Sequence, residues 1–295
     1  MKIIVTGARG QLGSQIVEDI NKGYSEIGEL PEVIKNAEVL GIDVEELDIS
    51  DLNKVKEFIS IQRPDVVINP AAYTNVDGCE SNEQLAYQIN ALGARNLAIA
   101  CEGIGAKLLH ISTDYVFSGE GNVPLKEYEL PAPQSVYGKT KLAGEEFVRE
   151  FCSKYYIVRT SWLYGYNGKN FVYTIMKAAQ ERGVLKVVND QKGNPTNAED
   201  LIHHLLKIIL TDEYGIYHCT GEGECSWYDF ASKIVEYGNI ECIVNPCTSD
   251  EFPSPTKRPT YSSLDNMMLR VTVGNEVREW QKALKEFIKR QNRTY

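Results

Sequence analysis

The sequence lacks the cysteine patterns of disulfide-bonded exported proteins and of zinc-binding domains. Its seven cysteines are an odd number, and no two of them form a CxxC pair. This pattern excludes a disulfide framework and a zinc knuckle as the basis of the fold. A reducing compartment suits such a chain, and we expect a cytoplasmic protein.

Long apolar runs are missing as well. The chain opens with Met1 and Lys2, and the apolar run Ile3-Ile4-Val5 that follows is too short for the core of a signal peptide. No stretch approaches the roughly 18 apolar residues that a membrane helix needs. We therefore expect a protein that is neither exported nor anchored in a membrane.

Positive charge is in deficit. Lys and Arg number 31 against 41 Asp and Glu, which gives a formal charge of −10. The field of such a molecule repels phosphate backbones and anionic lipid, so nucleic acid and membranes are not expected partners. An anionic ligand would have to be held by a local device, such as a helix N-terminus or a single arginine.

What the sequence does contain is an alternation of short apolar runs and helical segments. The runs are continuous, which is typical of parallel strands buried on both faces. They cover residues 2–5, 38–42, 65–68, 107–111, 156–159 and 185–188, and helical spacing is found over 11–21, 52–62, 82–102 and 139–153. The repeated strand–helix–strand pattern predicts an α/β fold with a Rossmann-like, doubly wound parallel sheet.

The alternation loosens after residue 165, where Gly-, Asn- and Pro-rich stretches such as 190–197 and 245–260 separate shorter helices. We predict one domain over residues 1–165, to which later segments return. A smaller C-terminal lobe is predicted over 166–295, with substrate binding as its main role.

A glycine-rich turn, Gly7-Ala8-Arg9-Gly10-Gln11-Leu12-Gly13, follows the first predicted strand and opens the first predicted helix. Glycine lets a backbone turn sharply and approach a pyrophosphate closely, and the amides at the helix N-terminus attract its charge. The strand–turn–helix context favours a dinucleotide fingerprint over the alternative, a plain tight turn. The domain over 1–165 is therefore expected to bind a nicotinamide dinucleotide.

Asp43 is the candidate for the acidic residue that holds the adenosine ribose. Such a residue normally follows the glycine turn by about 20 residues, and Asp43 comes later because the segment 21–36 reads as an insertion. A 2′-phosphate would meet like charge at Asp43, which favours NADH over NADPH. Two alternatives stay open: Asp43 is only a turn residue, or Arg9 compensates a 2′-phosphate and keeps NADPH in use.

Tyr137 and Lys141 form a YxxxK motif at the start of a helical pattern, which places both on one helix face. A nearby positive charge favours the phenolate, so the Tyr137 pKa is expected to move toward a range where the group exchanges a proton with an alcohol or ketone. Solvated surface pairs share this spacing, so the motif alone is weak. It gains weight from Thr113, at the C-terminal end of a predicted parallel strand, where open α/β sheets bind their ligands.

Segments spread over nearly the whole chain resemble one superfamily. They are GARGQLG at 7–13, NPAAYTNVD at 69–77, STDYVFSG at 112–119, VYGKTKLAGE at 136–145, RTSWLYG at 159–165, DQKGNPT at 190–196 and KRPTYSSLD at 257–265. The first segment and YxxxK resemble the extended short-chain dehydrogenase/reductases in general. STDYVFSG, RTSWLYG and DQKGNPT together resemble the dTDP-4-dehydrorhamnose reductase family within them.

The resemblance implies an activity and a set of roles. The family reduces the 4-keto group of dTDP-6-deoxy-L-lyxo-4-hexulose with NADH or NADPH and gives dTDP-L-rhamnose. It implies that Thr113 polarises the carbonyl, that Tyr137 donates the proton, and that Lys141 holds the nicotinamide ribose and lowers the Tyr137 pKa.

Binding residues follow from the same resemblance. Besides Asp43, Tyr137 and Lys141, the expected cofactor-binding residues are Gly7, Arg9, Gly10, Gln11, Leu12, Gly13, Asp48, Ile49, Ala71, Ala72 and Tyr73. The expected substrate-binding residues are Thr74, Val76, Asp114, Tyr115, Trp162 and Arg258. Arg258 would pair with the substrate diphosphate through its planar fork. The alternatives are a core aromatic for Trp162 and an isolated surface arginine for Arg258.

Some family members dimerise through a magnesium ion held by glutamates. Here Ser14 and Gln15 follow the glycine turn where an acidic residue is looked for. We therefore predict no metal, and a homodimer is only one possible state.

Two residues outside these motifs read as structural. His110 lies inside a predicted strand, so we expect a core residue. Trp227 follows Ser226 at a predicted helix N-cap and should serve packing.

Two other functions stay open. A different NDP-sugar reductase or an epimerase would reuse Thr113, Tyr137 and Lys141. A dehydratase needs an acid–acid pair after the threonine, and Asp114-Tyr115 does not supply it. A non-catalytic regulatory subunit with the same fold is the third alternative, against which the complete set of three residues argues.

Overall fold

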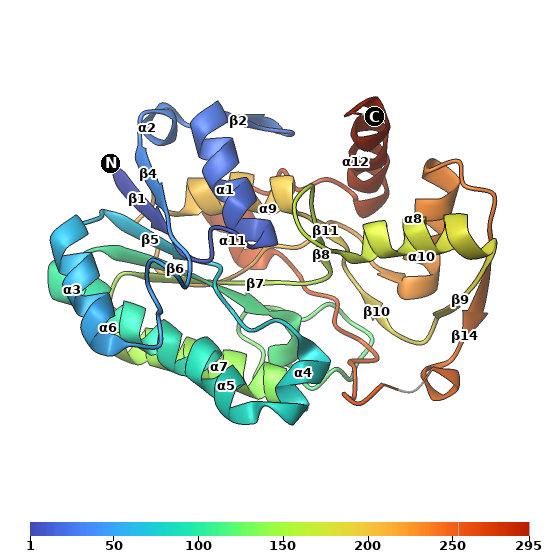
Figure 1. Cartoon of the computed structure of the whole chain (residues 1–295), viewed down its shortest axis with the longest axis horizontal. Helices are drawn as coiled ribbons and strands as arrows, with labels where there is room; N and C mark the ends of the chain where they lie inside the picture. The colour runs from blue at the N-terminus through green and yellow to red at the C-terminus, as the bar shows by residue number, and fades with distance from the viewer. Residues whose placement is uncertain (253, 295) are drawn as a thin grey trace.

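A six-stranded parallel sheet forms the centre of the computed structural model, which describes residues 1–252 and 254–294 (Figure 1). The strand order is β12-β7-β6-β5-β1-β4. Strand β4 is added on one side of β1 and β5 on the other, so the topological switch point of the sheet lies between β1 and β5. The strands are β1 (Lys2–Val5), β4 (Glu38–Gly41), β5 (Val66–Asn69), β6 (Lys107–Thr113), β7 (Tyr155–Thr160) and β12 (Gly215–His218). This sheet confirms the predicted doubly wound α/β fold.

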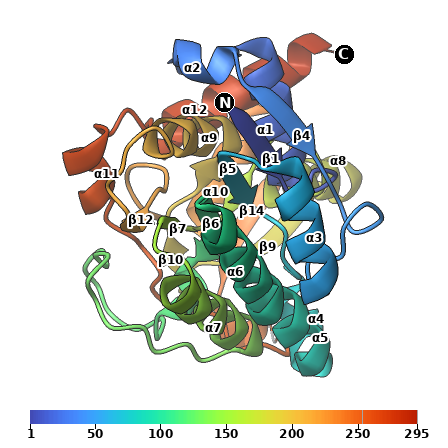
Figure 2. The same ribbon diagram turned by 90° about the vertical axis from the view of Figure 1, so that its left-hand side faces the viewer.

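Helices cover both faces of the sheet (Figures 1 and 2). One face packs on α1 (Gln11–Lys22), α9 (Ala198–Ile208) and α11 (Met267–Thr272). The other face packs on α3 (Leu52–Gln62), α6 (Ala94–Ile104) and α7 (Val136–Phe151). Because both faces are covered, the strands read as continuous apolar runs in the sequence.

The segment 82–102, predicted as one helix, is broken in its middle. It consists of α5 (Glu83–Tyr87), the π-helical turn η1 (Gln88–Gly93) and then α6. At this turn η1 packs tightly on α7: a Cβ on Gly144 would overlap the carbonyl oxygen of Asn90. The π-turn thereby places the Asn90 amide against Tyr73 and Thr140, which it hydrogen-bonds.

A second lobe lies on the right of Figure 1 and has its own apolar core. It contains α8 (Phe171–Arg182), β9 (Val184–Val188), α10 (Trp227–Tyr237), β14 (Ile243–Cys247) and α12 (Trp280–Thr294). The predicted strand at 185–188 exists as β9, but its grouping with the strands of the large sheet is wrong, because within the described residues β9 pairs with β14 in a two-stranded sheet. The sixth central strand is β12 instead, so this part of the chain returns to the first domain.

The remaining elements are short. They are β2 (Tyr24–Ser25), β3 (Gly28–Glu29), α2 (Glu32–Lys35), α4 (Val76–Ser81), η2 (Asp114–Val116), β8 (Leu163–Tyr164), β10 (Lys192–Gly193), β11 (Thr196–Asn197), β13 (Cys225–Ser226) and η3 (Ser249–Glu251).

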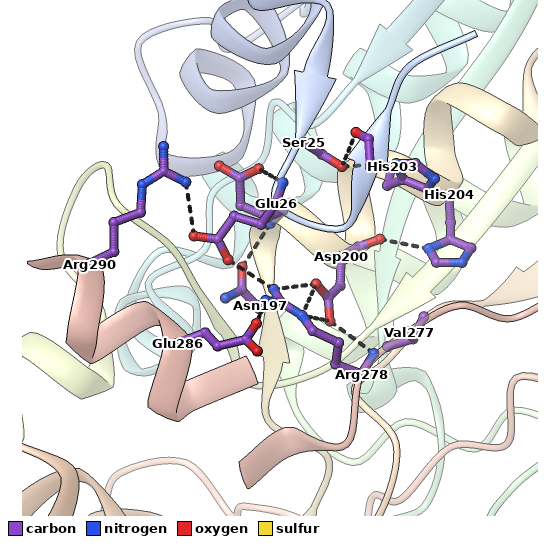
Figure 3. Close-up of polar contacts among 12 residues, drawn as sticks. Ser25, Glu26, Asn197, Asp200, His203, His204, Val277, Arg278, Glu286 and Arg290 are labelled. Atoms are coloured by element: carbon purple, nitrogen blue, oxygen red, sulfur yellow. Dashed lines mark hydrogen bonds and ion pairs between the residues drawn. The ribbon is translucent and has the colours of Figure 1, made fainter. Parts of the chain in front are cut away.

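The inserted segment 21–36 forms the β2–β3 hairpin and α2. Figure 3 shows how the hairpin is tied down: Ser25 contacts His203 of α9 at 2.8 Å, and Glu26 accepts a hydrogen bond from Arg278 at 2.9 Å. Arg278 precedes α12 and also binds Asp200 of α9. The insertion therefore joins α9 to the chain leading into α12.

All seven cysteines are free thiols. Within residues 1–252 and 254–294, no helix has the length and apolar character needed to span a bilayer.

Candidate active site

A cavity of about 1020 Å³ opens at the carboxyl ends of the central strands and extends to the second lobe. It brings together predicted residues from segments far apart in the sequence. Those on its wall are Gly7, Arg9, Gly10, Gln11, Leu12, Gly13, Asp43, Asp48, Ile49, Ala71, Ala72, Thr74, Val76, Thr113, Asp114, Tyr115, Tyr137, Lys141, Trp162 and Arg258. No residue of the insertion 21–36, which is described throughout, lines this cavity.

Tyr73 is the one expected binding residue that does not line the cavity. Its backbone N–H donates to Asn90 Oδ1 at 2.8 Å, and its hydroxyl lies beside Gly78 of α4. Tyr73 is therefore positioned to hold the loop after β5, while its neighbours Ala72 and Thr74 border the cavity.

The glycine turn has the geometry of a cradle for an anion. Gly7 has a φ of +55°, and a Cβ on Gly13 would overlap the Gly7 carbonyl oxygen, so both positions require glycine. Gly10 precedes α1 and has no side chain to cap the first amides of the helix. Gln11 and Leu12 of this first turn line the cavity, so a phosphate group fits here.

Asp43 lies just after β4 and is tied to the glycine turn. Its Oδ2 accepts the Arg9 backbone N–H at 2.8 Å, and the Arg9 guanidinium pairs with Glu45 and Glu46. Asp43 thus borders the cavity and also supports the glycine turn. The two interpretations of Asp43, as a ribose-binding residue and as a turn residue, are therefore compatible. Arg9 is paired with carboxylates that any 2′-phosphate would have to replace.

Thr113 and Tyr137 meet at the end of β6. Ser135 caps α7 by accepting the Gly138 N–H at 3.1 Å, which starts the helix just before Tyr137. A Cβ on Gly138 would overlap the Tyr115 carbonyl oxygen, so glycine lets α7 approach this closely. Thr113 donates to Asp114 Oδ1 at 2.9 Å, and its hydroxyl acts on the Tyr137 hydroxyl by lowering the pKa of that group.

The acid–base state of Tyr137 differs from the expectation. Burial raises the pKa of its hydroxyl above the usual range, and Asp114 raises it further. The expected lowering by Lys141 does not appear, because Lys141 Nζ donates to the Ile111 carbonyl at 2.6 Å and the burial effect is larger. Tyr137 is therefore protonated at neutral pH, the state that a proton donor needs.

Lys141 is buried, with 2% of its surface exposed. Burial lowers its pKa to about 8, while Glu145 one turn further along α7 opposes this shift. Glu145 in turn forms a buried pair with Arg159, with Oε2 to Nη2 at 2.7 Å, and accepts a hydrogen bond from Ser112. The amino group can thus change protonation state close to neutral pH.

Asp114 is buried beside Thr113, and burial raises its pKa to about 6. Tyr115 packs edge-on against Tyr137, with ring centroids 5.5 Å apart. These two residues wall the cavity next to the hydroxyl pair, where a substrate carbonyl has to lie for proton transfer.

The second lobe contributes an aromatic and cationic wall. Trp162 stacks on Trp227, and Phe171 lies against Trp227 with centroids 4.5 Å apart. Arg258 reaches the cavity and pairs with Asp77 at 3.5 Å. Lys169, which is exposed, is a second cation on this wall.

Sequence reasoning missed three of these wall residues: Lys169, Phe171 and Trp227. Trp227 was expected to serve packing and does pack against the core of the second lobe, but from the first turn of α10 it also lines the cavity. The capping signal at Ser226 correctly predicted where the helix begins, but not which way the first turn faces.

No group of three or more His, Cys, Asp or Glu side chains capable of holding a metal ion is found in the described part of the chain. In the position after the glycine turn, Gln15 donates from Nε2 to Asp19 at 2.8 Å and to Glu199 at 3.0 Å.

The fold, the glycine cradle and the Thr–Tyr–Lys set are those of a short-chain dehydrogenase/reductase. Residues 1–293 match the family described as RmlD substrate binding domain, and the chain belongs to this family.

Several similar proteins, matched over nearly their whole length, are named as dTDP-4-dehydrorhamnose reductases. A dTDP-4-dehydrorhamnose reductase from Clostridium acetobutylicum is 49% identical, with a TM-score of 0.93 over 99% of this chain and 100% of that one. One from Bacillus anthracis, solved in complex with NADP, is 42% identical, with a TM-score of 0.92 over 98% and 99% of the two chains. The dTDP-4-dehydrorhamnose reductase of Aggregatibacter actinomycetemcomitans is 39% identical over 298 residues, covering 96% of this chain and 97% of its own.

Proposed function

We propose that this protein is a dTDP-4-dehydrorhamnose reductase, which uses NADH or NADPH to reduce the 4-keto group of dTDP-6-deoxy-L-lyxo-4-hexulose to the alcohol of dTDP-L-rhamnose. The observation that carries the proposal is the meeting of Thr113, Tyr137 and Lys141 at one cavity that also contains the glycine cradle. Full-length similarity to reductases of this name supports the choice of substrate.

The cofactor fits the part of the cavity nearest α1. The glycine turn and the first amides of α1 would hold its pyrophosphate, and Asp43 would lie at the adenosine ribose. Asp48 and Ile49 would border the adenine, with Ala71 and Ala72 along its inner edge. When bound, the reduced nicotinamide supplies the hydride that reaches C4 of the sugar.

The protein's own residues handle the proton and the substrate. Protonated Tyr137 gives its hydroxyl proton to the oxygen at C4, and Thr113 hydrogen-bonds the same oxygen. Lys141 would hold the nicotinamide ribose, and its pKa of about 8 lets its amino group exchange a proton close to neutral pH. Each turnover thus adds a hydride and a proton to the ketone and leaves an alcohol and the oxidised cofactor.

The second lobe would bind the nucleotide part of the substrate. Trp162 and Asp114, which line the cavity, would contact the sugar, together with Thr74, Val76 and Tyr115. Arg258 would pair with the diphosphate through its guanidinium group. On substrate binding, this group would either leave Asp77 or contact Asp77 and the diphosphate together.

The test is consumption of reduced cofactor with the 4-keto-6-deoxy sugar nucleotide, followed at the nicotinamide absorbance band. Net consumption distinguishes a reductase from an epimerase, which returns its cofactor to the starting state, and from a regulatory subunit. Tyr137→Phe removes the proton donor and should lower turnover by about 10²–10⁴. Cofactor affinity should stay near the native value, and near-native turnover of this variant would sink the assignment of Tyr137.

A further inference from the structure

Three polar side chains cross the central sheet in one row. Asn69 of β5 pairs in register with His110 of β6, and Thr6, which follows β1, lies beside Asn69. The same face two residues earlier on each strand carries Ile4, Val67 and Leu108. A polar row thus replaces an apolar row at the end of the sheet nearest the cavity.

Hydrogen bonds join this row from end to end. Thr6 Oγ1 donates to Asn69 Oδ1 at 2.6 Å, and Asn69 Nδ2 donates to His110 Nδ1 at 2.9 Å. Because Nδ1 accepts, the ring proton of the neutral imidazole lies on Nε2, which is 3.4 Å from Lys141 Nζ and donates to it when the amino group is neutral. All four residues are at most 2% exposed. Buried polar groups are costly unless they are paired, so the row holds the imidazole in one place and aims it at Lys141.

The amino group of Lys141 is therefore held from two directions. It donates to the Ile111 carbonyl and abuts the His110 ring, both on β6. The charged and titratable groups that act on it are Glu145 on its own helix and His110 on β6, while Arg159 of β7 neutralises Glu145. His110 does not line the cavity, so it reaches the reaction only through Lys141.

We propose that His110 is a positioning residue for the reaction: fixed by Asn69 and Thr6, its imidazole holds the Lys141 amino group at the rim of the cavity. The proposal rests on the proposed function insofar as it takes Lys141 as a working residue. A core role alone would require only a side chain of similar volume at this position.

Two substitutions separate these roles. The amide of His110→Gln reaches the place of Nε2 and keeps contact with Lys141, whereas the amide of His110→Asn reaches only the place of Nδ1. His110→Asn should lower turnover by roughly 10–100-fold, as expected for a misplaced catalytic group. His110→Gln should stay within about 3-fold of native turnover. In both variants the KM for the sugar nucleotide should change by less than about 2-fold, because residue 110 does not line the cavity.

A second measurement needs no sugar. The pKa of Lys141 can be followed by NMR of lysine-labelled protein, with Lys141→Met to assign its signal. In His110→Asn, water fills the vacated space, and the pKa should rise from about 8 toward its usual value of 10.5. In His110→Gln it should remain near 8. Asn69→Ala, which frees the imidazole without changing it, should move the pKa in the same direction as His110→Asn and is the second variant should that protein fail to fold.

His218→Asn is the matched control. His218 is equally buried, on β12, and its Nδ1 contacts the Leu125 carbonyl at 3.1 Å, away from Lys141. Native turnover and Lys141 pKa in His110→Asn, or equal losses in His218→Asn, would overturn the positioning role while leaving the reductase activity intact. A native protein that does not consume cofactor, combined with the expected Lys141 shift, would instead refute the proposed substrate and keep the role of His110.

Discussion

The indole rings of Trp162 and Trp227 stack face to face, with centroids 3.5 Å apart and planes inclined by 7°. Trp162 has a φ of +47°, a region that non-glycine residues rarely occupy. Gly193 lies so close to the Trp162 ring that a Cβ there would collide with it. The ring is thus held between two segments of the second lobe, which offsets the strained backbone and fixes its orientation at the cavity.

Replacing Trp227 should therefore weaken substrate binding through Trp162. Trp227→Leu should lower the affinity for dTDP-L-rhamnose by about 2–10-fold, which corresponds to the loss of one aromatic pair. Trp227→Phe, which retains a ring, should lie between this variant and the native protein. Titrations with the product and separately with NADPH provide the check, and the NADPH affinity should not change. Equal losses for both ligands would mean general damage to the lobe.

Cofactor preference should depend on the charge of Asp43. Asp43→Ala should raise the ratio of kcat/KM for NADPH to that for NADH, because a 2′-phosphate no longer meets a carboxylate. The same change also removes the acceptor for the Arg9 N–H, so both cofactors should bind less tightly. Asp43→Asn separates these effects, since the amide oxygen keeps this hydrogen bond while the charge is lost. An unchanged ratio in both variants would show that Asp43 does not face the ribose.

Local spacing explains why much of the site was predictable. Gly7 to Gly13 and the pair Tyr137 and Lys141 each lie within one turn and one helix, so sequence distance determines their geometry. The binding residues in the loops around Ala71 and Arg258 were predicted only from the family resemblance, because no periodic pattern in the sequence indicates them. The position of Trp227 at the cavity was not predicted, because the direction of its side chain depends on how α10 packs in the second lobe, which is a tertiary property.

Strand membership could not be predicted in the same way. Residues 184–188 form an apolar, β-branched run, yet Val184 and Lys186 are exposed, as in a small sheet covered on one face. Strand β12, in contrast, begins with Gly215 and ends with His218, so its sequence does not form an apolar run. It is recognised as a strand of the sheet only from its pairing with β7 in the structure. The preference for NADH over NADPH remains a prediction.

Loss of Arg278 should unfold the protein more easily. Its guanidinium contacts Asp200 at 2.8 Å and Glu26 at 2.9 Å, and these carboxylates are almost fully buried (Figure 3). Arg278→Ala leaves Asp200 without its counter-charge and leaves Glu26 with Arg290 alone, so the free energy of unfolding should fall by about 3–5 kcal/mol. Arg270→Ala breaks a surface pair with Asp265 and should cost at most about 1 kcal/mol. Denaturant unfolding of both variants checks this difference, and similar losses would show that burial of the pair is unimportant.

The buried carboxyl of Asp19 should make stability fall as pH rises. Asp19 is 1% exposed, and burial, with the nearby charge of Glu199, raises its pKa to about 8 from an ordinary 3.8. Between these two values the folded protein keeps a proton that the unfolded chain has lost. The free energy of unfolding therefore decreases with pH across this window, with a slope of at most about 1.4 kcal/mol per pH unit, and levels off above the folded pKa.

Asp19→Asn should remove this slope. The amide oxygen still accepts the hydrogen bond that Gln15 donates to Asp19 Oδ1, and the group no longer titrates. The stability of the variant relative to the native protein should therefore increase steadily from about pH 5 to about pH 8.5, measured by denaturant unfolding at several pH values. Glu18→Gln is the control: Glu18 pairs with Lys22 and its pKa is lowered, so its contribution is lost only as pH falls through the acid range. The native slope should persist in Glu18→Gln, and an equally steep slope in Asp19→Asn would assign the proton to another buried group, with Glu199 the first to test.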